Sequence, residues 1–212
     1  MSRSPLARVA GPIALGAGAL LLIQQLAMLS FLDRSRIEAT MANPLFVPLA
    51  ALYFVAFCGL LVALVAAYSW EADEAGVFGL VGFLAALVGT TFLAGDLWFE
   101  AFAVPWLGDV APASLHVAGG TLVIGAFTGY LLFAVGWALF GIASLRARVF
   151  PMPNSIAIII GGIIGFQAAL PPFAIALALA IGWLGLWMIR TTAVQRANGR
   201  TESMTVVDAG GQ

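Results

Sequence analysis

Long apolar segments, separated by short polar or proline-containing joints, are the dominant pattern of this 212-residue chain. A helix needs about 20 mostly apolar residues to cross the hydrocarbon layer of a bilayer. Apolar segments of this length must be helical there, because the backbone finds no water to bind. The pattern predicts an all-α polytopic membrane helix bundle with six transmembrane helices, at about 11–31, 45–69, 77–104, 116–144, 154–170 and 172–189.

The last two segments meet at Leu170-Pro171-Pro172-Phe173. Two successive prolines remove two helix donors, which favours a tight turn at this point. A single kinked span is the competing interpretation. The 34 residues from Ile156 to Ile189 would form a helix of about 51 Å, whereas the apolar layer is about 30 Å thick. We therefore expect two short helices.

The arginines predict the orientation of the bundle. All nine basic residues are arginine, and six spans that start inside place Arg34 and Arg36 outside and the other seven in the cytoplasm. This is the bias that the positive-inside rule describes, so both termini are expected to be cytoplasmic. Residues 1–190 form the transmembrane domain in this interpretation. Residues 191–212 are polar, and we expect them to form a disordered cytoplasmic tail.

Composition supports a membrane protein and narrows its chemistry. Hydrophobic residues make up 62% of the chain, charged residues make up 9%, and the mean hydropathy is +1.05. The net charge of −1 gives no electrostatic basis for binding nucleic acid, so the bilayer itself is the expected partner. One histidine cannot supply paired haem ligands, and HExxH, GxSxG and phosphate-binding glycine motifs are absent from the sequence. We expect no cofactor, no metal and no catalytic residue.

Two carboxylates within an apolar segment are the most informative chemical feature. Asp96 and Glu100 lie one helical turn apart, on either side of Trp98, near the expected outer boundary of the third span. A charge near the bilayer centre costs roughly 2.5 to 3.5 kcal/mol. Such a pair is therefore retained either for function or because it lies at the water interface. The interfacial interpretation, with both acids ionised and facing solvent, stays open.

The functional interpretation adds two residues that follow the third span. Asp109 lies in the expected outer loop and His116 begins the fourth span, so all four groups could converge on one outer-facing pocket. Neighbouring carboxylates raise each other's proton affinity and an imidazole titrates near neutrality, which suits a proton or cation site. A divalent metal set would use the same residue types. No spacing signature for a metal accompanies them.

Other polar and small residues predict how the spans pack. Gln24 and Gln25 at mid-span are expected to bind neighbouring helices, or to line a cavity below the acids together with Trp98. The pairs Gly125/Gly129 and Gly161/Gly165 each place two glycines on one helix face and predict close helix packing. Cys58 is expected to be buried and inert. The run Glu71-Ala72-Asp73-Glu74 is expected to be a solvated inner connection.

The segments Gly95–Leu107 (GDLWFEAFAVPWL) and Leu139–Pro151 (LFGIASLRARVFP) carry a likeness to other proteins. Here the chain resembles a loosely defined group of small multi-span bacterial membrane proteins of unknown function, common in actinobacteria and related lineages. The resemblance covers most of the chain. It implies a location in the bacterial cytoplasmic membrane and a bundle of about six helices, and it carries over no active-site residues.

These patterns favour a small transport or sensing protein with an outer-facing acidic site for a proton, a cation or another small ligand. Two other functions stay open. One is a non-catalytic accessory or assembly subunit that binds a membrane-protein partner through its helix faces. The other is an intramembrane lipid-modifying enzyme, for which Asp96 and Glu100 have the DxxxD-like spacing of prenyl-transfer motifs but not the repetition.

Overall fold

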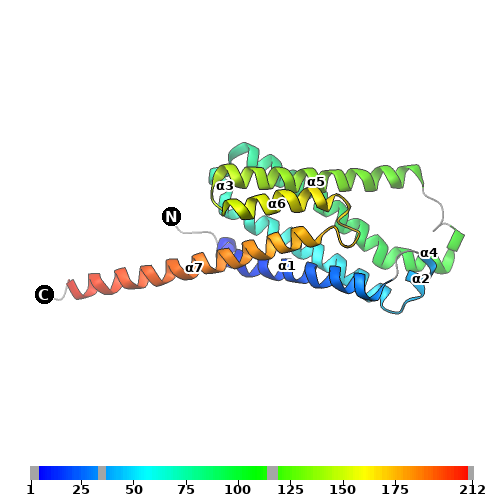
Figure 1. Cartoon of the computed structure of the whole chain (residues 1–212), viewed down its shortest axis with the longest axis horizontal. Helices are drawn as coiled ribbons and strands as arrows, with labels where there is room; N and C mark the ends of the chain where they lie inside the picture. Colours follow the sequence, from blue (N-terminus) through cyan, green and yellow to red (C-terminus); the bar gives the residue numbers. More distant parts are fainter. Residues whose placement is uncertain (1–4, 33–36, 114–118, 210–212) are drawn as a thin grey trace.

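The structure is a computed structural model that describes the backbone of residues 5–32, 37–113 and 119–209, and the side chains of 8–32, 39–113 and 119–194. Within these ranges the chain is helical and contains no strand, which confirms the all-α prediction. The elements, drawn in Figure 1, are α1 (Pro5–Phe31), α2 (Ile37–Ala42), α3 (Phe46–Trp98), the π-helix η1 (Phe99–Ala103), α4 (Val104–Val110), α5 (Gly120–Ala147), α6 (Met152–Ile164), the 3₁₀-helix η3 (Gly165–Gln167) and α7 (Ile175–Ala209).

Four helical stretches in the described part are long and apolar enough to cross a membrane, and they agree with the expected class of protein. They are Arg8–Phe31, Phe46–Val110, Gly120–Ala147 and Ile175–Val194. Six separate spans were expected. The difference has two causes: two of the expected spans are joined within α3, and α6 is short.

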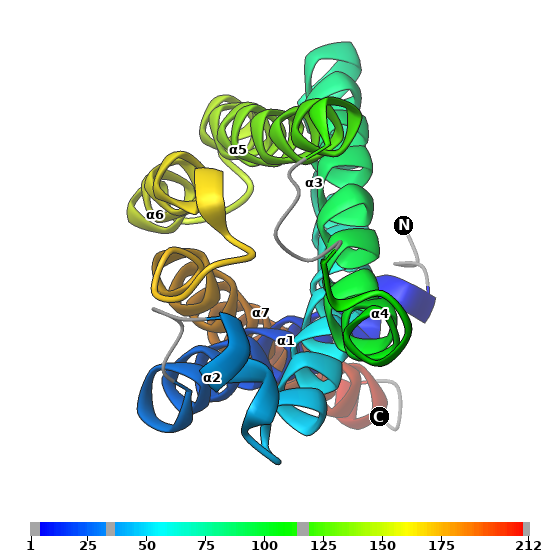
Figure 2. The same cartoon turned by 90° about the vertical axis from the view of Figure 1, so that its right-hand side faces the viewer.

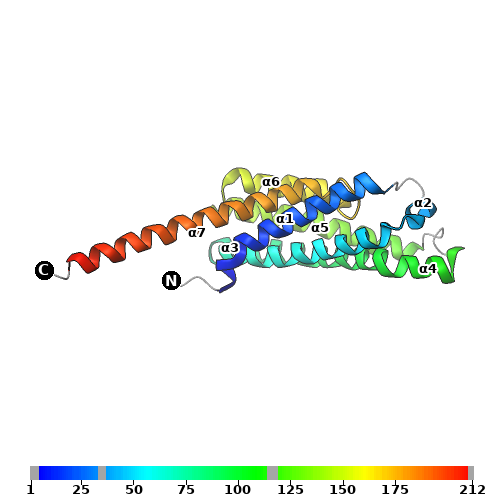
Figure 3. The same cartoon turned by 90° about the horizontal axis from the view of Figure 1, so that it is seen from below.

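The first cause is a reversal inside α3. Gly76 has φ 57° and ψ −157°, and it divides α3 into an outgoing arm, 46–75, and a returning arm, 77–98. This backbone conformation is accessible almost only to glycine. Figures 1 and 3 show the two arms running side by side in opposite directions. The arms occupy the segments predicted at 45–69 and 77–104, and the outgoing arm continues six residues further than expected.

The second cause is the connection between α6 and α7. A turn with a cis Pro171–Pro172 peptide separates them, so two helices, and not one kinked helix, occupy this segment. α6 has 13 residues, which is about 20 Å of helix and less than the apolar layer requires. The segment expected at 154–170 is thus a short apolar helix continued by η3.

The helices form a closed ring. α1 packs against α3 and α7, α3 packs against α5, and α6 joins α5 to α7. Figure 2 shows this ring end on. Fully buried aromatic side chains, among them Phe57, Phe133 and Trp137, fill the centre. The Trp137 indole donates a hydrogen bond of 3.0 Å to Thr90 Oγ1, which ties α5 to the returning arm of α3.

α7 departs from the sequence-based expectation at its C-terminal end. The helix continues to Ala209, where a disordered tail was expected after Arg190. Figure 1 shows this part of α7 extending beyond the bundle. No proline interrupts the chain between Ile175 and Ala209, so the helical backbone can continue without a structural break.

Candidate functional site

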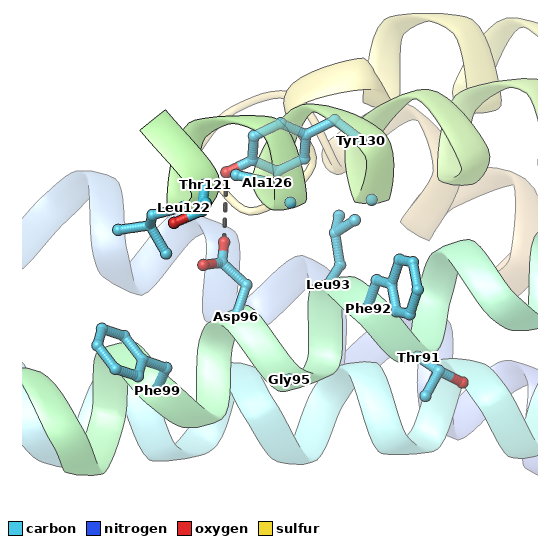
Figure 4. Close-up of a pocket in the computed structure, with 12 residues that line it drawn as sticks. Thr91, Phe92, Leu93, Gly95, Asp96, Phe99, Thr121, Leu122, Ala126 and Tyr130 are labelled. Carbon is cyan, nitrogen blue, oxygen red and sulfur yellow. Dashed lines mark hydrogen bonds between the residues drawn. The ribbon is translucent and has the colours of Figure 1, made fainter. Parts of the chain in front are cut away.

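Asp96 lies on the returning arm of α3, half-buried, and faces α5. The hydroxyl of Tyr130 on α5 donates a hydrogen bond to Asp96 Oδ2 at 3.3 Å. Figure 4 shows the carboxylate pointing toward Tyr130, with Phe99 and Leu122 beside it. The acid that the sequence singled out is therefore held by a partner on the neighbouring helix.

A pocket of about 430 Å³ surrounds this pair, between the returning arm of α3 and the first half of α5. Its walls are mostly apolar, and Phe92, Phe99 and Leu122 remain exposed at its edge. The pocket is therefore open toward the outside of the bundle. The residues that line it are Thr91, Phe92, Leu93, Gly95, Asp96, Phe99, Thr121, Leu122, Gly125, Ala126, Gly129 and Tyr130.

Glycine positions explain why the two helices separate here. A Cβ on Gly89 would lie 2.2 Å from the Phe133 nitrogen, so α3 and α5 touch at that level. One level further along, a Cβ on Gly129 would lie 3.1 Å from the Phe92 Cβ. At Gly125 a Cβ would meet no atom within 4 Å. The helices diverge along this series, and the pocket occupies the space that opens between them.

The predicted glycine pairs thus have different environments. A Cβ on Gly161 would lie 2.7 Å from the Leu177 Cα of α7, and one on Gly165 would lie 3.0 Å from the Phe133 ring. Gly129 contacts Phe92 as described above. Gly125 forms no helix contact of this kind, because it lies where α5 has already moved away from α3.

Glu100 does not join Asp96 in the pocket. It lies in the π-helix η1 and is half-buried, but it is not among the residues that line the pocket. The sequence-based expectation that both acids line one pocket therefore holds for Asp96 and not for Glu100.

The other predicted site residues are also separate from the pocket. Asp109 is exposed on α4, and Trp98 is exposed with its ring centroid 5.9 Å from that of Phe102. His116 lies outside the described residues. Of the described candidates, Asp96 is the acid that lines the pocket.

Gln24 and Gln25 are fully buried and have structural partners. Gln25 Nε2 donates to the hydroxyl of Tyr53, which in turn donates to the carbonyl of Ala168 in the connection before α7. Gln24 Nε2 donates to the carbonyl of Leu49 at 3.3 Å. Both amides therefore join α1 to the outgoing arm of α3, and neither lines the pocket.

Tyr130 is a site residue that the sequence analysis did not single out. Its available signal is its position directly after Gly129, which also lines the pocket. Cys58, expected to be buried, is partly exposed. Within the described ranges, no three His, Cys, Asp or Glu side chains come together in a way that could hold a metal ion.

Comparisons with protein-family models, with curated proteins and with solved structures found no match to this chain.

Proposed function

We propose that this chain is a small protein of the bacterial cytoplasmic membrane, with six membrane segments of which the one formed by α6 and η3 is short, that binds an amphipathic, cationic small molecule at Asp96 for transport or sensing. The ligand would combine an apolar body with a positively charged or hydrogen-bond-donating group. The site would face the outer side of the membrane, and both chain termini would be cytoplasmic.

The arrangement of helix ends supports the topology. The start of α1, the Gly76 turn and the joint between α5 and α6 lie at one end of the bundle, and α2 and α4 lie at the other (Figures 1 and 3). The Gly76 end carries the exposed arginines of the described part, Arg8, Arg146, Arg148 and Arg190. By the positive-inside rule this end is cytoplasmic, so the end that holds α2 and α4 is the outer one.

The shape and chemistry of the pocket support the ligand class. A volume of about 430 Å³ lies in the range of small-molecule pockets, which are typically apolar with a few polar groups that orient the ligand. In a bilayer, the exposed edge formed by Phe92, Phe99 and Leu122 would meet lipid. A ligand could therefore enter from the outer leaflet with its apolar part first and its cationic group directed to Asp96.

A single observation carries the proposal, namely the half-buried Asp96 carboxylate held by Tyr130 inside an otherwise apolar pocket. An acid needed only for topology would be expected to face water, as Asp109 does. A carboxylate within apolar walls provides strong recognition of a cation, because the low dielectric strengthens their attraction.

The test uses two probes of similar size and opposite charge, tetraphenylphosphonium and tetraphenylborate, with the full-length protein in detergent. We expect the cation to bind more tightly than the anion. Asp96→Asn should raise the dissociation constant of tetraphenylphosphonium at least about tenfold, equivalent to about 1.4 kcal/mol. Asp109→Asn is the matched control, because this acid is exposed and distant from the pocket lining.

Equal binding of the two probes, or unchanged cation binding by Asp96→Asn, would contradict an acidic ligand site. The pocket would then be a lipid-filled groove, and the accessory-subunit interpretation would become the better one.

A further inference from the structure

Glu71 is a carboxyl group completely removed from solvent at the cytoplasmic end of the bundle. It lies on the outgoing arm of α3, five residues before Gly76, and it is 0% exposed. Asp73 and Glu74 on the same arm are exposed. The expectation that this whole run is solvated is therefore wrong for Glu71, because the helix continues through it and turns Glu71 toward the interior.

Burial dominates the surroundings of Glu71, and among the described residues the Ser144 side chain is the group that favours its charged form. Neither carboxyl oxygen has a hydrogen-bond partner among the described residues. Ser144 of α5 is a polar neighbour of the carboxyl. Its hydroxyl donates to the carbonyl of Phe140 at 3.0 Å, so its hydrogen is already used.

The charged side chains near this end point elsewhere. On α5, Arg146 and Arg148 are exposed, and the Arg146 guanidinium lies over the ring of Phe78, 4.8 Å from its centroid. Arg8 on α1 and Arg190 on α7 are exposed as well. The nearest charge to act on Glu71 from its own helix is Glu74, which is negative and disfavours a second negative charge.

Further buried polar groups lie on α6, which packs against α5. Asn154 Oδ1 and Ser155 Oγ are buried and have no partner among the described residues. The backbones of α5 and α6 are close here, since a Cβ on Gly141 would lie 3.0 Å from the Ser155 carbonyl oxygen. Gly141 is about one helical turn before Ser144 on α5. Buried polar groups without partners thus occur on α6 as well as on α3.

Aromatic side chains close this region toward the cytoplasmic end. The rings of Trp70 and Trp187 lie 5.9 Å apart, and the ring of Phe150 lies 5.9 Å from that of Trp187. Trp70 directly precedes Glu71 in the chain. The cluster joins α3, α7 and the α5–α6 connection, and the Glu71 side chain next to it in the chain is fully buried.

An ionised carboxylate in such a place loses its hydration and gains no nearby positive charge, which disfavours the charged form. A neutral carboxylic acid avoids this cost. Its hydroxyl can also donate to Ser144 Oγ, whose lone pairs are free to accept because its hydrogen binds Phe140. The geometry thus matches the protonated form of Glu71.

We propose that Glu71 is a proton-binding site, buried between α3 and α5 at the end of the bundle opposite Asp96, that holds a neutral carboxylic acid at neutral pH. The group that binds is a proton delivered from the aqueous phase, and its release leaves a carboxylate that the surrounding helices must accommodate by moving or by admitting water. Glu71 therefore couples proton binding to the packing of α3 against α5.

Infrared spectroscopy of the full-length protein in detergent tests this proposal, because a neutral carboxylic acid has a C=O stretching band that a carboxylate lacks. An ordinary glutamate titrates near pH 4.3, so we record spectra between about pH 5 and pH 9. We expect a carboxylic-acid band at neutral pH that decreases toward the alkaline end. Glu71→Gln should remove the band, whereas Glu74→Gln, which changes an exposed acid on the same helix, should retain it.

Absence of the band in the wild-type protein at neutral pH would overturn the proposal without any variant. Persistence of the whole band in Glu71→Gln would also overturn it and would assign the band to another acid. Asp96→Asn provides the distinction from the ligand pocket, since the band must survive this substitution. Glutamine resembles the neutral acid in size and polarity, so the variant is expected to fold.

Discussion

The hydroxyl of Tyr130 and the carboxylate of Asp96 meet across 3.3 Å, at the level where α5 and the returning arm of α3 have moved apart. Below this level glycines bring the two backbones into contact, and above it a pocket opens. The pair therefore bridges the two helices within the pocket and fixes the direction of the acid that lines it among the described residues.

Tyr130→Phe removes this bridge and keeps the ring. We expect it to lower the free energy of unfolding by about 0.5 to 1.5 kcal/mol, the usual net value of one hydrogen bond. Thermal unfolding of the purified protein measures the change. Tyr68→Phe serves as the control, because the Tyr68 ring stacks on Phe83 at 4.3 Å and this contact does not need the hydroxyl. Equal effects of the two substitutions would argue against a stabilising role for the bridge.

Gly89→Ala and Gly125→Ala test the divergence of α3 and α5 with the same change in composition. At Gly89 the new methyl group would overlap the Phe133 backbone, so we expect a loss of at least about 1 to 3 kcal/mol of stability. At Gly125 the methyl group enters open space, and alanine in a helix should be neutral or stabilising by up to about 1 kcal/mol. It should also narrow the pocket and weaken binding of tetraphenylphosphonium. Similar stabilities of the two variants would contradict the divergence of α3 and α5 between Gly89 and Gly125.

Gly76→Ala isolates the backbone requirement of the turn. A Cβ at Gly76 would meet no atom within 4 Å, so any destabilisation comes from the positive φ of 57°. We expect a cost of about 1 to 3 kcal/mol. Gly95→Ala is the matched control, since this glycine is also surrounded by open space but lies within a regular helix. If both variants unfold at the wild-type temperature, the reversal at Gly76 does not need glycine.

Cysteine labelling tests the proposed topology. In a Cys58→Ala background, Asp109→Cys should react with a membrane-impermeant maleimide added outside intact spheroplasts. Glu74→Cys should react only after the membrane is permeabilised, because Glu74 lies at the Gly76 end of the bundle and Asp109 lies on α4 at the other end (Figure 1). Both acids are exposed, so access to the reagent is not limited by burial. Labelling of both from the same side would rule out the two arms of α3 as separate spans.

The proposed proton site predicts a specific dependence of stability on pH. The folded protein would bind a proton at Glu71 more tightly than the unfolded chain does, so this contribution is complete at acidic pH and is lost as the pH rises. We expect the unfolding temperature of the wild-type protein to fall between about pH 4.5 and pH 7, where the unfolded chain has lost this proton and the folded protein still holds it, and to level off above that interval. Glu71→Gln, which cannot ionise, should be less sensitive to pH over this range. Parallel curves for the two proteins would show that Glu71 does not gain a proton on folding.

Much of the fold could be predicted because it depends on local pattern. The apolar segments, a reversal between residues 69 and 77 and the turn at Pro171–Pro172 agree with the structure, although the helix continues through the run expected to form the connection. The shortness of α6 was less predictable, since residues 165–170 are apolar enough to continue a helix yet leave it for a 3₁₀-turn. Hydropathy reports which residues avoid water, but it does not report where a helix ends within an apolar segment.

The candidate site was only partly predictable. Asp96 stood out as an acid in an apolar segment, but its partner Tyr130 lies 34 positions away on another helix. The four-residue spacing to Glu100 suggested a shared pocket, but Glu100 is not among the residues that line it. Glu71 was assigned to solvent because Asp73 and Glu74 accompany it, and only its rotational position on α3 distinguishes it from them.

The amino-acid sequence by itself determined that this chain is a helical protein suited to a membrane, where its apolar segments lie, and which acids are unusual for that setting. These properties follow from composition and from short-range spacing. The tertiary structure decided which acid faces a pocket, which is buried and which is exposed. The reason is physical, since the rotation of each helix about its axis is set by close contacts such as that of Gly89 with Phe133, between residues far apart in the chain.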